Sequence, residues 1–423
     1  MILVFLAFLA LLLVGVPIAF ALGLAGTVGI LDRGLALVSV PSRMFTGIDS
    51  FILLSAPFYI LAGELMNRGG VTDRLIRFAQ LLTRGLRGGT AYANNLASIV
   101  FAGISGTAIA DTAALGQVFI KGMPKEGYTR EFAAAVTVAG SMIGPIIPPS
   151  VIMIIYAAVS RLSVIDLFLS GVVPGLMLAL AVSVVVFIKG RKGGLPTSTI
   201  TVARGEVPVM ARDTLLVLSL PLLIVAGTVS GTFTATEAGG VAALYAALLG
   251  FLVFRSLSLR EAWAALVISA RTTSSLFLII AAATVCSYVL ALSGINQATA
   301  GLAATFAGDP ILFMLAVMAA LLVVGCFLEP GAAIVLFVPM LMPVAMKLGI
   351  DPLQFAIVVV LTLTFGLMTP PVGVCLFVAC KIGNISMTGL VRALVPFFLA
   401  EVAVVVLVIL FPGFASWLPG LFR

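Results

Sequence analysis

The sequence predicts an all-α polytopic membrane protein built as an inverted repeat, with two re-entrant helical hairpins and two transmembrane helices broken by proline. Composition gives the first observation, because 62% of the 423 residues are hydrophobic, 9% are charged and the mean hydropathy is +1.28, whereas soluble domains carry about 25% charged residues. The second observation is that the chain matches itself when it is shifted by 222 positions. Seven residues then align in one register, namely Gly103, Lys125, Gly127, Gly144, Pro148, Pro149 and Pro174 with Gly325, Lys347, Gly349, Gly366, Pro370, Pro371 and Pro396. In membrane proteins, paired hydrophobic segments interrupted by Gly and Pro indicate a transporter whose site lies where the broken segments meet.

Apolar runs near or above the roughly 20 residues needed to cross a bilayer recur along the chain. They cover residues 2–31, 51–66, 166–188, 214–230, 236–254, 272–292 and 390–412. The first run lacks a basic beginning and stays apolar for too long to be a signal peptide. We therefore expect it to form one membrane helix, bent or eased at Pro17. The runs leave no soluble region large enough for a separate catalytic domain.

Residue types exclude several function classes. Histidine is absent, which excludes Ser-His-Asp catalysis, zincin motifs and histidine proton relays. The cysteines lie in apolar segments without zinc-like spacing and are expected to be small buried hydrophobes: Cys286, Cys326, Cys375 and Cys380. The net charge of +7 is expected to come from loop residues on the cytoplasmic side and not from a nucleic-acid interface.

Arginine distribution predicts the topology. The segment 67–89 contains five arginines against a single Asp73, and its leucines alternate with arginines at helical spacing, so we expect a cytoplasmic amphipathic helix along the interface. Two further basic clusters should also be cytoplasmic: Lys189, Arg191, Lys192, Arg204 and Arg212, and then Arg255, Arg260 and Arg271. Both ends of the segment 90–188 lie on the cytoplasmic side only if this segment crosses the membrane an even number of times. The stretch 90–120 must therefore be a re-entrant hairpin, followed by an interrupted helix at about 131–159 and a span.

The second repeat is expected to have the opposite orientation. The span 272–292 leads outside to 293–310, which contains no Lys or Arg, and a second hairpin at about 311–345 enters from that side. The chain then divides into N-terminal scaffold helices (1–66), a cytoplasmic arm helix (67–89), transport repeat 1 (90–188), a linker with scaffold helices (189–292), a periplasmic arm helix (293–310) and transport repeat 2 (311–423).

Four places combine membrane depth with non-helical backbone, which is tolerated only where it is buried in protein or lines a watery cavity. They are the tips 103–116 and 325–334 and the breaks 144–150 and 366–373. Prolines at the breaks remove N–H donors and should free the carbonyls of Gly144, Pro145, Gly366 and Leu367. Such carbonyls, with Ser105 and Thr107 at one tip and Glu329 at the other, suit Na⁺, whereas helix N-termini suit anionic substrate groups.

Several carboxylates can be interpreted either as functional or as structural groups. Asp111 lies four residues after Thr107 and should share its helix face, either for a functional contact or to bond backbone at the turn. Glu329 either binds an ion or closes its hairpin by a hydrogen bond. Glu64, Glu237 and Glu401 are expected to be mostly structural, and Arg43 and Asp49 to lie on a solvated external loop.

At these residues the chain resembles the large membrane (M) subunit of tripartite ATP-independent periplasmic, or TRAP, transporters. The motifs that carry the resemblance are PFYILAGELMNRGG (57–70), SGTAIADTAALG (105–116), KEGYTREFAAAVTVAG (125–140), IGPIIPPS (143–150), GCFLEPGAAIVLFVPMLMP (325–343) and FGLMTPPVGVCLF (365–377). Together they span nearly the whole chain.

The resemblance implies a multi-pass protein of the bacterial inner membrane that imports an organic acid by a sodium-coupled elevator mechanism. It implies a small membrane (Q) subunit on a separate polypeptide, as for the unfused type, and a soluble periplasmic (P) subunit that delivers the acid. By position, the resemblance assigns one sodium site to Ser105, Thr107, Gly144, Pro145 and Pro148, and the other to Glu329, Gly331, Gly366 and Thr369. Asp111, Pro149 and Pro371 would lie nearer the substrate, together with Thr107. The alternative is a self-sufficient ion or dicarboxylate transporter with the same hairpin architecture; an enzyme is not expected.

Overall fold

The computed structural model describes residues 2–198, 206–293, 301, 305–306 and 308–422, and over these residues the predicted all-α class is confirmed. The described residues form helices joined by turns and short loops, with one isolated bridge between Arg87 and Thr197. Six of the described helices are long and apolar enough to cross a membrane by length and composition: Val164–Arg191, Val207–Val229, Ala235–Val253, Leu259–Leu292, Pro330–Lys347 and Met387–Leu410.

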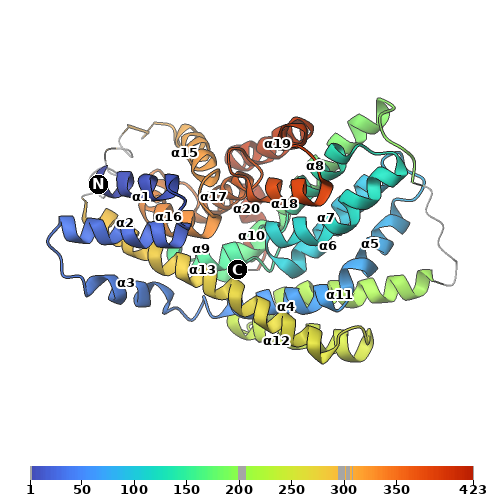
Figure 1. Cartoon of the computed structure of the whole chain (residues 1–423), viewed down its shortest axis with the longest axis horizontal. Helices are drawn as coiled ribbons and strands as arrows, with labels where there is room; N and C mark the ends of the chain where they lie inside the picture. Colours follow the sequence, from blue (N-terminus) through green and yellow to red (C-terminus); the bar gives the residue numbers. More distant parts are fainter. Residues whose placement is uncertain (1, 199–205, 294–300, 302–304, 307, 423) are drawn as a thin grey trace.

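Figure 1 colours the helices in chain order, and the two aligned halves meet near the centre of the molecule. The N-terminal part comprises α1 (Ile2–Leu13), α2 (Ile18–Asp32), α3 (Ser39–Ile48), α4 (Ser55–Arg68) and α5 (Val71–Leu82). The first half of the repeat comprises α6 (Gly89–Ser105), α7 (Ala108–Gly122), η1 (Met123–Glu126), α8 (Arg130–Ser141), α9 (Val151–Ser160) and α10 (Val164–Arg191). Between the halves lie α11 (Val207–Val229), α12 (Ala235–Leu248), η2 (Leu249–Val253) and α13 (Leu259–Leu292). The second half comprises α15 (Pro310–Gly325), α16 (Pro330–Lys347), α17 (Pro352–Gly366), α18 (Val374–Gly383), α19 (Met387–Leu410) and α20 (Gly413–Gly420).

The helix boundaries follow the register seen in the sequence. α7 and α16 begin at Ala108 and Pro330, which are 222 positions apart, and α8 and α17 begin at Arg130 and Pro352 with the same separation. Side-chain caps set several of these starts, because the first N–H groups of a helix have no intrahelical acceptor. Thr129 accepts from Phe132 N at the start of α8, and the other caps in this set are Ser150, Glu329 and Asp351 for α9, α16 and α17.

The two halves of the repeat interlock. α7 packs against α8 of its own half and against α18 of the other half, while α16 packs against α17 and against α9. One contact of this kind lies at Gly331 of α16, beside the side chain of Ile155 in α9. Each second hairpin arm therefore rests on helices from both repeats, and the buried core runs across the junction.

The predicted single N-terminal helix over 2–31 is wrong. α1 ends at Leu13 and α2 begins at Ile18, and the two helices pack against each other. Gly29 of α2 lies against Val4 of α1, so the chain reverses direction between them. The reversal follows from Gly15, whose φ of +87° is left-handed and closes the helix end, and from Pro17, which cannot donate to a preceding turn.

A long helix, α13, packs against α2. It extends over Leu259–Leu292, contacts α2, α3, α4 and α16, and crosses much of Figure 1. Arg260 and Arg271 therefore lie within a helix and not in the loop that the third basic cluster predicts. Arg43 also differs from its expected loop position, because it belongs to α3 and its guanidinium stacks over the Tyr288 ring at 3.8 Å.

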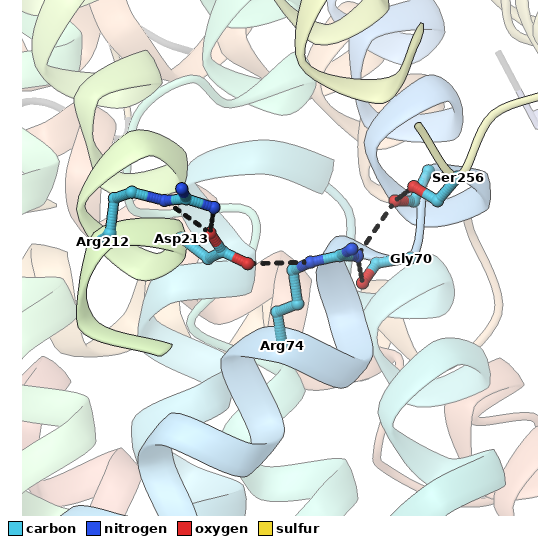
Figure 2. Close-up of polar contacts among 6 residues, drawn as sticks. Gly70, Arg74, Arg212, Asp213 and Ser256 are labelled. Carbon is cyan, nitrogen blue, oxygen red and sulfur yellow. Dashed lines mark hydrogen bonds and ion pairs between the residues drawn. The ribbon is translucent and has the colours of Figure 1, made fainter. Parts of the chain in front are cut away.

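The arm helix α5 is amphipathic, and contacts of Arg74 near its start hold it to neighbouring segments. It buries Val71, Leu75, Ile76 and Ala79 and exposes Arg77. Figure 2 shows Arg74 donating from Nε to Asp213 Oδ2 at 3.1 Å and from Nη1 to the Gly70 carbonyl at 2.9 Å. Its guanidinium also lies 4.3 Å from the centre of the Phe254 ring. α5 is thus attached to α11 and to the segment after η2. The periplasmic counterpart predicted at 293–310 falls mostly outside the described residues.

Candidate transport site

The first break separates α8 from α9. α8 ends at Ser141 and α9 begins at Val151, with Pro148 and Pro149 between them. Ser150 closes the gap from both sides, since its Oγ donates to the Pro145 carbonyl and accepts from Met153 N. All seven of these residues are buried, so the Ser150 side chain organises a non-helical segment inside the protein.

The second break separates α17 from α18. Pro370 and Pro371 lie between Gly366, the last residue of α17, and Val374, the first of α18. Unlike their counterparts, both prolines are exposed. Thr369 is half-buried, and its Oγ donates back to the Phe365 carbonyl at 2.7 Å.

The expectation of four unpaired carbonyls at the breaks is wrong for three of them. Pro145 O accepts from Ser150 Oγ, Gly366 O from Thr369 N at 3.1 Å, and Leu367 O from Cys375 N at 3.0 Å. Donors from further along the chain replace those that proline removes. Within the described part of the chain, no donor reaches Gly144 O. A carbonyl has two lone pairs, so the paired oxygens keep one position each for another ligand.

The first hairpin tip turns at Gly106 and Thr107. Gly106 has a left-handed φ of +61° and lies against the Pro149 carbonyl, where a side chain would collide. Thr107 is extended and precedes α7 without capping it through its side chain. The N–H groups of the first turn of α7 therefore have no side-chain acceptor and add a partial positive charge.

Asp111 lies behind this tip and does not face outward. It is completely buried, its Oδ1 accepts from Ser105 Oγ, and its Oδ2 has no hydrogen-bond partner within the described part of the chain. Oδ2 lies directly against Gly144 of the first break. The structure thus brings Ser105, Asp111 and Gly144 together, and Thr107 adjoins them through its N–H, 3.3 Å from Ser105 Oγ.

The second tip is built differently. Glu329 caps α16 by accepting from Ala332 N at 3.3 Å, and its carboxylate lies beside Gly331. Gly325, at the end of α15, meets Gly366 so closely that a methyl group on Gly366 would overlap the Gly325 backbone. Backbone thus contacts backbone here, whereas Asp111 fills the gap beside Gly144 in the first half.

A central cavity of about 420 Å³ joins these elements. Ser105, Thr107, Pro145, Glu329 and Leu367 contribute to its wall, so both tips and both breaks reach it. The opposite wall comes from α4 and α13, through residues that include Glu64, Asn67, Thr272 and Ser275. Neither Lys nor Arg occurs among the described residues that line it.

A second cavity, of about 480 Å³, continues from the first. The two share four wall residues: Glu64, Asn67, Ala110 and Ala113. The second runs along α7 to Gln117 and reaches Thr72 and Asp73 on α5. Glu64 lies where the two meet, with Arg68 Nε 3.8 Å from its Oε2. A continuous hollow therefore leads from the hairpin tips to the arginine-rich arm helix.

The predicted site residues fall into three groups by position. Ser105, Thr107, Pro145 and Glu329 line the central cavity. Those buried behind its wall are Asp111, Gly144, Pro148, Pro149, Gly331 and Gly366, and those near the outer surface are Thr369 and Pro371. Sequence reasoning missed the polar wall of α13, although the run Thr272–Ser275 inside an apolar span was a usable signal.

Comparison with known proteins decides the family. The sequence model described as "Tripartite ATP-independent periplasmic transporter, DctM component" matches residues 5–414. The chain belongs to this family. It is 37% identical to the sialic acid TRAP transporter large permease protein SiaM of Vibrio cholerae over 415 residues, covering 98% of this chain and 97% of that protein. It is 38% identical to the C4-dicarboxylate TRAP transporter large permease protein DctM of Pseudomonas aeruginosa over 401 residues, covering 95% and 94%.

The fold also resembles a solved transporter. The YdaH transporter of Alcanivorax borkumensis superimposes with a TM-score of 0.63 at 13% identity, covering 89% of this chain and 87% of that one. Family membership makes the chain a membrane transporter subunit of the inner membrane and not an enzyme. The expected TRAP membership is confirmed.

Proposed function

We propose that this chain is the large membrane subunit of a sodium-coupled importer that moves an organic acid by an elevator mechanism. In this proposal α6–α7 and α15–α16 are re-entrant hairpins, and the helices of the two repeats carry the site past a scaffold that includes α4 and α13. The observation that carries it is the central cavity, whose wall combines both tips and both breaks with the scaffold helices. Two relatives named for sialic acid and C4-dicarboxylates support a carboxylate as the substrate.

The charge of the cavity supports coupling to a cation. Glu64 and Glu329 line it, Asp111 lies just behind it, and no described lining residue is cationic. A carboxylate substrate entering alone would meet negative charge without a positive side chain to offset it. The uncapped start of α7, at Thr107, supplies partial positive charge for the carboxylate, and bound Na⁺ supplies the remainder.

The sodium ligands follow from the two tips. Ser105, Thr107, Gly144, Pro145 and Pro148 would hold one ion, with Asp111 contributing its unpaired oxygen. Glu329, Gly331, Gly366 and Thr369 would hold the other. Oxygen donors of these types suit a hard monovalent cation. Asp111, Pro149 and Pro371 are assigned to the substrate only by the resemblance, and none of the three lines the cavity of this structure.

The hollow also indicates which side is open. It extends from the tips to α5, the helix predicted to be cytoplasmic from its arginines. We therefore assign the structure to the inward-facing state, in which substrate leaves along α7. A small membrane subunit and a soluble periplasmic binding protein complete the tripartite system that the family name denotes.

Uptake in liposomes tests the proposal. The chain is reconstituted with its small membrane subunit, and uptake of a labelled acid is measured with an inward Na⁺ gradient, with K⁺ in its place, and with or without the binding protein. We expect uptake only with both Na⁺ and the binding protein. Equal uptake driven by a pH gradient in sodium-free buffer contradicts the coupling.

Matched variants localise the ions. Ser105→Ala and Glu329→Gln should raise the Na⁺ concentration needed for half-maximal uptake, whereas Ser416→Ala removes an exposed hydroxyl far along the chain and should not. The alternative function is a self-sufficient transporter with the same hairpin architecture. Undiminished uptake without the binding protein would establish it instead.

A further inference from the structure

A third cavity lies away from the transport site. It has a volume of about 440 Å³, opens to the surface, and is lined by the end of α7, by η1, by the start of α8 and by the end of α18. It shares no lining residue with the central cavity or with its extension. It is therefore spatially separate from the cavity assigned to the transported acid.

Positive charge dominates its wall. Lys121, Lys125 and Arg130 line it, together with the amide side chain of Asn384, and no carboxylate is among the described lining residues. Lys121 Nζ donates to the neutral Gln117 Oε1 at 2.5 Å. None of the three cations forms an ion pair with any residue that the structure describes.

The two nearest carboxylates in the sequence are engaged elsewhere. Glu126 accepts a hydrogen bond from Thr90 Oγ1, and Glu131 lies against Gly389 of α19. Three like charges around one hollow repel one another, and neither of these carboxylates lines the hollow to neutralise them. An anion held between them would relieve that repulsion.

The geometry favours a phosphate group as that anion. Arginine presents a planar fork of donors and lysine a compact point charge, and both are used to bind phosphate. Arg130 is the first residue of α8, so the partial positive charge of this helix end adds to the side chains. Ile120 and Ile382 contribute an apolar side to the same cavity, which suits the carbon chain attached to a phosphate ester.

The position of this third cavity relative to the arginine-rich segment 67–89 indicates that it lies on the cytoplasmic face of the membrane. α7 begins at the hairpin tip and returns toward the side where α6 begins, next to the arginine-rich segment. Basic pockets between membrane helices on the cytoplasmic side bind phosphate head groups. We propose that the cavity of Lys121, Lys125 and Arg130 is a phosphate-binding site that takes the head group of an anionic lipid or the phosphate of a small cytoplasmic ester.

Binding measurements with the full chain separate the two sources. In one arm the purified chain in detergent is titrated with inorganic phosphate and with glycerol phosphate. In the other, the chain is placed in nanodiscs of phosphatidylcholine with increasing phosphatidylglycerol, and retained lipid is quantified by native mass spectrometry. The test variant is Lys121→Gln/Lys125→Gln/Arg130→Gln. The control is Arg77→Gln/Arg84→Gln/Lys192→Gln, which removes three exposed cations outside the cavity.

Each cation near a phosphate is worth a factor of about five in affinity, so the triple variant should lose on the order of 100-fold. The control should stay within about threefold of the parent chain. Phosphatidylglycerol retention that depends on the three cations supports a lipid head group, and equivalent dependence for glycerol phosphate alone supports a soluble ester. If neither probe binds, or if both triple variants lose affinity equally, the site is refuted. The single variant Lys125→Gln, expected to lose about fivefold, decides the matter if the triple variant does not fold.

Discussion

Removing the carboxylate of Asp213 should loosen the arm helix α5 from the scaffold. Asp213 is only 6% exposed and accepts from Arg74 Nε at 3.1 Å and from Arg212 Nη2 at 2.8 Å. The substitution Asp213→Asn keeps the shape of the side chain and removes its charge. Both arginines then lose an ionic partner, but only Arg74 belongs to α5.

The exposure of the two arginines sets the magnitude. Breaking a fully buried ion pair costs about 3–5 kcal/mol, and an exposed pair contributes about 0.2–1 kcal/mol. The Arg74 side chain is 28% exposed and that of Arg212 is 61% exposed. We therefore expect a coupling free energy of about 1–2 kcal/mol for Arg74 with Asp213, and below about 1 kcal/mol for Arg212 with Asp213.

Hydrogen exchange measures this locally. Because about 1.4 kcal/mol corresponds to a tenfold change in an equilibrium, the α5 amides should exchange about 5- to 30-fold faster in Asp213→Asn if they open by local unfolding. A double-mutant cycle with Arg74→Gln isolates the pair, and Arg212→Gln is the matched control on the same carboxylate. Unchanged exchange in α5, or an equal effect of the two arginine variants, would refute the reasoning.

Three further predictions concern packing and hydrogen bonds. Gly366→Ala should abolish uptake and lower the melting temperature, because a methyl group would overlap backbone of the second tip, whereas Gly240→Ala, with open space around it, should leave both intact or raise stability by up to about 1 kcal/mol. Ser105→Ala should destabilise the chain by about 1–3 kcal/mol in thermal unfolding without Na⁺, since it leaves the buried Asp111 carboxylate without its donor; a neutral result contradicts that hydrogen bond. Gln354→Met keeps the volume but removes two bonds of 2.9 Å to carbonyls at the end of α19, so α19 should lose about 1–3 kcal/mol of protection in its last turn, and unchanged exchange there would contradict it.

Glycine and proline made several helix boundaries predictable from the sequence. Their effects are local, since proline removes a donor and glycine permits a left-handed turn whatever surrounds them. Both second hairpin arms, starting at Ala108 and Pro330, therefore begin at the positions that the repeat predicts. The amphipathic pattern of α5 was readable for the same reason, because a helix with one buried face has a periodic sequence.

Features that depend on tertiary partners were not predictable. A helix kinked at Pro17 and two short antiparallel helices have the same apolar composition, and the packing of Val4 on Gly29 decides between them. Asp111 was expected to share a face with Thr107, but Thr107 has extended backbone and lines the central cavity, whereas Asp111 is buried behind the tip. The pairing of the Leu367 carbonyl at the second break depends on Cys375, a donor eight positions further along the chain, which no helical rule indicates.

The interlocking of the two repeats constrains how the chain is made. The partner of α9 is α16, which is synthesised only after α10 to α15 have emerged. During synthesis the face of α9 around Ile155 therefore lacks its native neighbour until α16 has been made. Neither half could bury that surface alone, so two separate half-length chains would have to pack against each other to cover it.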